Sequence, residues 1–275
     1  MRRRPALVVA IALLAAQGCA HKKEVREAEI EHLSAQGLYD RSQLELASGS
    51  LRKAKMDLER VQFTAEDRPK LEPLVRLGLA DVTFYQGDQI SLIEARSKYM
   101  DFVTLYSDHP KAPYAQLQAG VCSLKQVRDP SRDQAQTQKA ITDLREVAKR
   151  YPKSAYVDPA QDMIDEAERS LAEHEFRVGY FYYKRKSYEA ASHRFRTILD
   201  QYPKYPEREK LYFYMGDALI HANNDAEGRI YLDKLLTDYP EGQFADDARK
   251  ALAAAAPPAS SGAKKEDVTS RLSPG

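Results

Sequence analysis

Proline-containing stops divide the chain into segments of helical pattern, and three of the four follow a tyrosine directly. A proline cannot continue a helix, and a tyrosine before it can pack over the last turn. Strand signals are scarce between the stops. The stops recur at intervals of about 37 to 51 residues, a period that is typical of a helical solenoid. They lie at Pro110, Pro152, Pro203 and Pro240.

Small residues in the last two segments follow the tetratricopeptide (TPR) pattern. That pattern needs small side chains where its two helices approach most closely, because a large one would hold them apart. Equal spacing relates Gly179, Ala191 and Pro203, and again Gly216, Gly228 and Pro240. Large apolar residues are expected to fill the second helix of each pair, namely Phe195, Ile198, Leu232 and Leu235.

We therefore predict an all-α fold over residues 28–255, a TPR-like helical-hairpin solenoid of about five repeats with a C-terminal capping helix. The capping helix is expected over Phe244 to Ala255, and the first helix of the fourth hairpin should be long, since Ala160 to Lys186 holds no breaker except Gly179. The five hairpins are expected at 31–66, 70–110, 111–153, 155–203 and 206–240.

The N-terminal residues have the pattern of a signal peptide. Three arginines precede an apolar run over 6–16, which is shorter than the roughly 20 residues that span a bilayer. A cysteine at the cleavage point resembles a bacterial lipobox. We expect a lipoprotein signal peptide over 1–18, lipidation at Cys19 and an acylated tether over 19–27. An ordinary secretory signal cut nearby is the alternative, since Ala16 stands where a lipobox prefers leucine.

The C-terminal residues 256–275 are rich in Pro, Ser, Gly and charge and are expected to form a disordered tail. Nothing after the signal peptide looks transmembrane. Cys122 lies on a helical pattern and is expected to be a small buried residue rather than a reactive thiol.

Charge and motif content argue against several function classes. Lys+Arg total 42 against 41 Asp+Glu, which offers no electrostatic reason to expect a nucleic-acid partner. The sequence holds no HExxH, no CxxC, no glycine-rich phosphate loop and no GxSxG. We therefore expect no enzyme activity, no cofactor and no metal site.

A solenoid whose sequence holds no recognisable catalytic motif indicates a binding protein. Stacked hairpins form a concave surface that their first helices line, and aromatic residues on such a surface suit extended peptides. Long helices and loops could instead cover these side chains. The TPR register gives as peptide groove candidates Tyr39, Gln43, Leu77, Asp81, Phe84, Phe176, Tyr180 and Tyr183, with Phe213 and Asp217 in the last repeat.

The segment AEHEFRVGYFYYKRKSYEAASHRFRTILDQYP (172–203) resembles the fourth repeat of the BamD family. Its E-x-x-V run before paired tyrosines, its K-R-x-x-Y turn and its A-x-x-R-F core carry the likeness. REVAKRYPKSAYVDPA (145–160) resembles the junction that precedes that repeat. BamD is the lipoprotein of the β-barrel assembly machine in the Gram-negative outer membrane.

The resemblance implies a lipid-anchored protein on the periplasmic face of the outer membrane. In that family the N-terminal half receives the C-terminal targeting segment of unfolded outer-membrane proteins. The C-terminal repeats dock on the barrel subunit BamA, beside other assembly lipoproteins. The matched position for docking is Arg194, whose guanidinium suits a multi-donor contact. An exposed helix arginine in solvent is the simpler interpretation.

The first two repeats match the family weakly, and SDHP (107–110) replaces the expected Tyr-Pro. The groove candidates are therefore less well supported than the docking position. Three alternatives stay open: a TPR pilotin for a secretin or pilus, a Tol–Pal cell-division coordinator, and a glycan enzyme on a helical scaffold. Insertions between repeats argue against the first alternative and the lipobox argues against the second. The third would require a carboxylate pair that converges in a groove.

Overall fold

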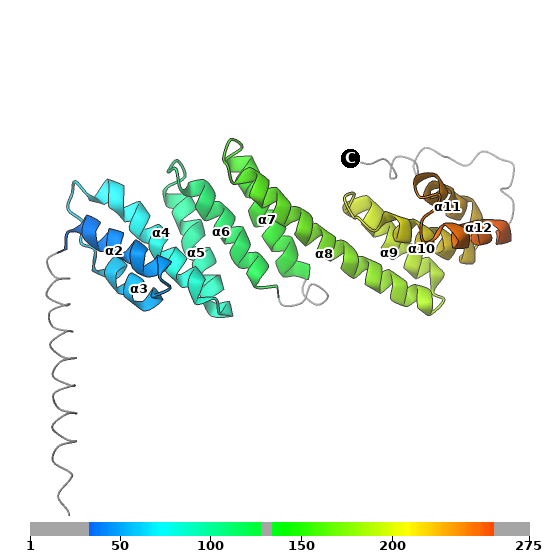
Figure 1. The fold of residues 1–275 in the computed structure, drawn as a ribbon, viewed down its shortest axis with the longest axis horizontal. Coiled ribbons are helices and arrows are strands. Elements are labelled where there is room, and N and C mark those ends of the chain that lie inside the picture. Colours follow the sequence, from blue (N-terminus) through cyan, green and yellow to red (C-terminus); the bar gives the residue numbers. More distant parts are fainter. Residues whose placement is uncertain (1–32, 128–133, 256–275) are drawn as a thin grey trace, which may run out of the picture. The chain divides into compact units, whose positions relative to one another are not determined.

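The computed structural model describes residues 33–127 and 134–255 of the 275-residue chain. The predicted signal peptide, Cys19, the tether and the C-terminal tail lie outside these residues. Within them the chain forms eleven helices and no strand. The helices in Figure 1 are α2 (Ala35–Ala47), α3 (Leu51–Arg60), α4 (Arg68–Gln86), α5 (Gln89–Leu105), α6 (Ala112–Lys125), α7 (Gln134–Arg150), α8 (Val157–Lys184), α9 (Tyr188–Gln201), α10 (Arg208–His221), α11 (Asp225–Asp238) and α12 (Ala245–Ala254).

These helices pair as five successive hairpins followed by a capping helix, which confirms the predicted fold class. Helices α2 and α3, α4 and α5, α8 and α9, and α10 and α11 pack against each other. Helices α6 and α7 are joined by a buried hydrogen bond of 2.9 Å from the Ser123 hydroxyl to Asp143. The long helix expected in the fourth hairpin is α8, which has 28 residues.

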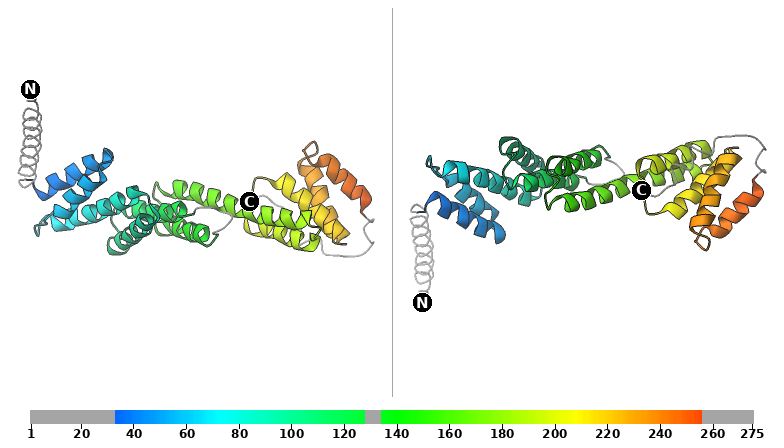
Figure 2. Two further views of the ribbon diagram at one scale, coloured as in Figure 1. Left: turned by 90° about the horizontal axis from the view of Figure 1, so that it is seen from below. Right: turned by 90° about the horizontal axis from the view of Figure 1, so that it is seen from above.

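Two compact units divide the chain, and their boundary falls inside α6, after Cys122. The N-terminal unit has a core that includes Leu58, Val75 and Val82. In the C-terminal unit α12 packs on α11 and α10, as Figure 2 shows in orange and red. All four large residues predicted to fill second helices are fully buried there, namely Phe195, Ile198, Leu232 and Leu235.

Local sequence signals set the helix ends. Ser34 caps α2 by accepting a hydrogen bond from the Gly37 amide at 3.1 Å, and Asp88 caps α5 in the same way. Tyr202 and Tyr239 are the C-cap residues of α9 and α11, so these two of the three Tyr-Pro stops end a helix where predicted.

Small residues allow the closest helix contacts. A Cβ atom built on Gly228 would lie 2.7 Å from the carbonyl oxygen of Gly216, and one built on Gly179 would lie 2.6 Å from the Phe195 ring. Real Cβ atoms do not approach neighbouring atoms so closely. The predicted reason for these glycines, close approach of paired helices, is therefore confirmed.

Two further expectations concern the burial of Cys122 and the presence of membrane-spanning helices. Cys122 is buried, as expected for a small core residue. Among the described residues, no helix combines the length and the apolar character that a membrane crossing requires.

We predict that Gly228→Ala lowers the free energy of unfolding by about 1–3 kcal/mol, because the added methyl group meets backbone that cannot move away cheaply. Gly37→Ala is the matched control, since its Cβ would lie at an ordinary 3.4 Å from Leu33. The control should not lower stability, because alanine favours helix over glycine. Urea unfolding followed by circular dichroism measures both, and equal effects would contradict the close-packing explanation.

Candidate functional site

The first helices of successive hairpins lie side by side within each unit. Helix α2 contacts α4 in the N-terminal unit, and α10 contacts both α8 and α12 in the C-terminal unit. This is the arrangement that a groove lined by first helices requires. The candidate residues on these helices can therefore be examined as two surfaces, one in each unit.

A hydrogen-bonded carboxylate organises the surface of the N-terminal unit. The hydroxyl of Tyr99 on α5 donates to Asp81 Oδ1 at 2.6 Å, and that of Tyr114 on α6 donates to the same atom at 2.9 Å. Asp81 on α4 thus joins three helices. Burial raises the pKa of Asp81, although the two phenols act in the opposite direction. Burial and this carboxylate also raise the pKa of both tyrosines, which keeps their hydroxyls as donors.

Two other candidates, Tyr39 and Phe84, lie near this carboxylate or its donors, and Gln43 lies on α2 beside Gly78 of α4. Tyr39 on α2 is half-buried, and burial followed by the charge of Asp81 raises its pKa. The Phe84 ring packs edge-on against Tyr99 with centroids 6.4 Å apart. Gln43 is half-buried on α2 and donates to the Ser42 hydroxyl at 3.4 Å. The structure therefore places Tyr39 near Asp81, and Phe84 against Tyr99, one of the two phenols that donate to Asp81.

Two candidates are buried instead of lining an open surface. Leu77 is only 5% exposed and Phe176 only 2%. Phe176 packs on Phe195 of α9 at 5.3 Å, and the Lys210 ammonium covers its ring at 4.0 Å. Neighbouring helices cover both side chains, so the expectation that they face a groove is corrected.

Stacked aromatic rings form the surface of the C-terminal unit. Tyr180 lies almost parallel to Phe176 and to Tyr183, with centroids 6.3 and 6.2 Å apart. Tyr214 of α10 meets all three rings edge-on, at 5.8, 5.1 and 5.0 Å. Burial, with Tyr180 beside it, raises the pKa of Tyr214 to about 12. Tyr180 is 36% exposed, so the stack presents one accessible ring to solvent.

Tyrosine–carboxylate hydrogen bonds link equivalent helices of successive repeats. Tyr183 on α8 donates to Asp217 on α10 at 2.6 Å, across 34 residues. The Tyr114–Asp81 bond joins α6 to α4 across 33 residues. Tyr99 and Tyr114 were missed from the sequence. For Tyr114 the signal was an acid and a tyrosine about one TPR repeat apart on first helices, whereas Tyr99 lies on a second helix, where this signal does not apply.

Arg194 lies between the helices of the fourth hairpin. Its Nη1 atom donates to Glu175 Oε2 at 3.0 Å, which joins α9 to α8. The Arg194 side chain is 42% exposed, whereas Glu175 is buried. Arg194 is thus an exposed arginine anchored at one end by an internal ion pair.

The chemistry of both surfaces suits binding. No group of His, Cys, Asp and Glu side chains able to hold a metal ion occurs in 33–127 or 134–255. Asp81 and Asp217 accept hydrogen bonds from phenols whose pKa is raised, so the tyrosines do not act as bases near neutral pH. The surfaces offer aromatic faces, a carboxylate and a guanidinium to a partner.

We predict that the stability of the wild type falls relative to Asp81→Asn as the pH rises from about 4 to 7. Because the pKa of Asp81 is raised above its ordinary value of 3.8, the folded state holds the proton more tightly than the unfolded chain. Ionisation therefore costs folding free energy. Tyr114→Phe, which removes one donor to Asp81, should steepen the loss. Urea unfolding across this pH range checks both, and parallel curves for wild type and Asp81→Asn would refute the assignment.

Comparison with known proteins identifies relatives along most of the chain. The family model YfiO, described as an outer membrane lipoprotein, matches residues 31–229. The outer membrane protein assembly factor BamD of Caulobacter vibrioides is 28% identical over 278 residues, which covers 98% of this chain and 90% of the relative. The BamD of Xylella fastidiosa strain Temecula1 is 24% identical, covering 82% and 78%. That of Rickettsia prowazekii is 26% identical, covering 52% and 57%.

These relatives confirm the resemblance to BamD that the fourth repeat indicated. The family match includes every hairpin from α2 to α10 and the start of α11. The chain therefore belongs to the YfiO family of outer membrane lipoproteins.

Proposed function

We propose that this protein is a non-catalytic, lipid-anchored subunit of the outer-membrane β-barrel assembly machinery, on the periplasmic face of the membrane. The observation that carries the proposal is the similarity to the Caulobacter assembly factor over 98% of the chain. The names of the relatives favour assembly over a pilotin or a Tol–Pal coordinator.

The surface around Asp81 is proposed to receive segments of unfolded outer-membrane proteins. Both phenols donate to Asp81 Oδ1, and no donor from the described residues reaches Oδ2. A half-buried carboxylate oxygen is a strong acceptor for a backbone N–H group of an extended chain. Tyr39 and Phe84 add aromatic area beside it, and Gln43 adds an amide on α2.

The stack around Tyr180 is a second peptide-binding candidate, with Tyr183 fixed beneath it by Asp217. An aromatic ring held in place by its neighbours offers contact area with little loss of side-chain entropy.

Arg194 is proposed to dock the protein on a BamA-like barrel subunit. Its guanidinium has five N–H donors, and one hydrogen bond to Glu175 leaves the others for a partner. Glu175 also fixes the direction of the side chain, which lowers the entropy cost of a contact.

Cys19 is proposed to be the acylated residue, supported by the lipobox-like sequence around it. Tethering would raise the local concentration of the protein beside its membrane partner.

We predict that Arg194→Glu lowers recovery of a large barrel protein with periplasmic repeats at least about tenfold, in pull-downs from solubilised outer membranes. The substitution removes the proposed donor and places a carboxylate opposite Glu175. The matched control is Lys149→Glu, which reverses another ion-paired cation of the C-terminal unit.

Thermal unfolding of both variants controls for loss of fold. Unchanged recovery with a folded Arg194→Glu variant would leave Arg194 with a purely structural role. Recovery of a secretin by the wild type would overturn the assembly function itself.

We predict that Tyr39→Ala weakens binding of a fluorescent peptide from the C-terminus of an outer-membrane protein about tenfold. Tyr39 contributes the aromatic area beside Asp81. Leu44→Ala is the matched control, because Leu44 is 72% exposed on the same helix and would not line this surface. Fluorescence anisotropy measures both affinities. Equal affinities for the two variants would remove the surface around Asp81 as the peptide site.

A further inference from the structure

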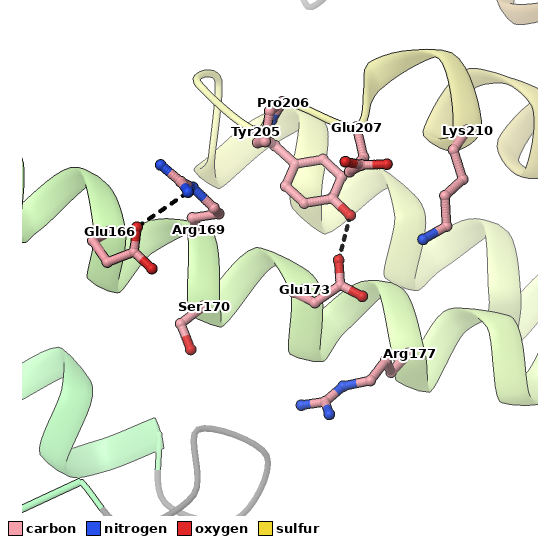
Figure 3. A pocket seen from close by; sticks show the side chains of 9 residues that line it. All are labelled: Glu166, Arg169, Ser170, Glu173, Arg177, Tyr205, Pro206, Glu207 and Lys210. Carbon is pink, nitrogen blue, oxygen red and sulfur yellow. Dashed lines mark hydrogen bonds and ion pairs between the residues drawn. The ribbon is translucent and has the colours of Figure 1, made fainter.

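A polar cleft of about 570 Å³ lies on the side of α8 that faces the connection from α9 to α10. Figure 3 shows it from close by. Helix α8 supplies Arg169, Glu173 and Arg177, and the other wall supplies Tyr205, Glu207 and Lys210. Lys210 also contacts Phe176 of the aromatic stack, and the other five residues belong to neither of the surfaces described above.

A buried tyrosine determines which charged side chains on the α8 wall pair with each other. Tyr205 is only 3% exposed, and its hydroxyl donates to Glu173 Oε2 at 2.7 Å. Glu173 and Arg177 are four residues apart, a spacing at which acid and base commonly pair on a helix. They form no ion pair here, and the Glu173 carboxylate points to Tyr205 instead (Figure 3). Tyr205 thus leaves the Arg177 guanidinium without an internal carboxylate in the described parts of the chain.

The Lys210 ammonium is a second cation of the cleft that forms no ion pair within the described parts of the chain. It lies 4.0 Å from the centroid of the Phe176 ring and reaches into the cleft from α10 (Figure 3). No carboxylate of residues 33–127 or 134–255 forms an ion pair with it. The third cation, Arg169, is instead paired with Glu166 at 3.1 Å. The aromatic ring holds the Lys210 ammonium in place by a cation–π contact.

The charges of the lining do not favour a polyanion. Glu166, Glu173 and Glu207 balance the three cations, so the cleft has no net positive charge. A phosphate group with two charges would be repelled by the carboxylates beside it. A single carboxylate carries half that charge and is repelled about half as strongly, and Glu207 can accept a hydrogen bond from an N–H group next to that carboxylate.

The dimensions of the cleft suit an extended chain. From Arg169 to Arg177 the cleft follows α8 for about 12 Å at the helical rise of 1.5 Å per residue. An extended peptide covers that length with about four residues. We propose that this cleft binds an acidic side chain, Asp or Glu, of an extended peptide segment, with Arg177 and Lys210 as its two cationic contacts. The proposal does not depend on the proposed docking at Arg194 or on the surface around Asp81.

The test uses the full-length protein and two blocked hexapeptides, acetylated and amidated, which differ only by Glu against Gln at one central position. Fluorescence anisotropy should show the Glu peptide binding about tenfold more tightly than the Gln peptide. Arg177→Gln combined with Lys210→Gln should abolish that difference. Arg169→Gln, which removes a cation already paired with Glu166, is the matched control and should preserve it.

Tyr205→Phe is the more discriminating variant, because it removes one hydroxyl group and no charge. It should release Glu173 to pair with Arg177 and weaken the Glu peptide several-fold, with little effect on the Gln peptide. Unfolding midpoints of all variants establish that they are folded.

Four results would overturn the proposal. They are no binding of the Glu peptide up to about 1 mM, equal binding of both peptides, equal binding of a Gln peptide with a free C-terminal carboxylate, and displacement by inorganic phosphate at or below the peptide concentration. The third would assign the cleft to chain termini, and the fourth to phosphate. The result of the pull-down with Arg194→Glu does not depend on any of these peptide-binding results.

Discussion

Close approach between the two helices of the fourth and fifth hairpins is the constraint on which the C-terminal unit depends. At Gly216 and Gly228 two backbones meet with no room for a methyl group, and at Gly179 the same is true against the Phe195 ring. When paired helices are this close, each hairpin is a thin unit that can stack directly on the next. Stacking in turn sets the first helices side by side, and the candidate binding surfaces lie on those helices.

Much of the fold could be predicted from the sequence because its signals are local. A proline stop, a small residue at a close contact and an unbroken helical run each act within a few turns, so the hairpins and the long α8 were all foreseen. The burial of individual side chains could not be predicted in this way, because it depends on the helices of neighbouring repeats. Leu77 and Phe176 have the right register for a groove, yet adjacent helices cover them. The partners of Asp81 and Arg194 lie on other helices, and no local pattern specifies which carboxylate a given phenol or guanidinium will reach.

The two units offer different chemistry to a partner. The N-terminal surface is built around one carboxylate that three helices share, so it presents an acceptor beside aromatic rings. The C-terminal unit instead presents guanidinium and ammonium groups, with Arg194 on one hairpin and Arg177 and Lys210 at a separate cleft. At the cleft these cations lie beside glutamates that balance their charge.

The tyrosine–carboxylate bonds between repeats also bear on how the family can vary in length. The stretches from Asp81 to Tyr114 and from Tyr183 to Asp217 span 33 and 34 residues, although the proline stops are spaced much less evenly. One residue inserted into a helix rotates everything after it by about 100°, which would turn a bonded side chain away from its partner. Insertions in relatives should therefore avoid the helices of these two stretches, and the connection at 128–133, between α6 and α7, lies outside both stretches. The repeats are thus free to differ in length only where no phenol has to reach a carboxylate on the next repeat.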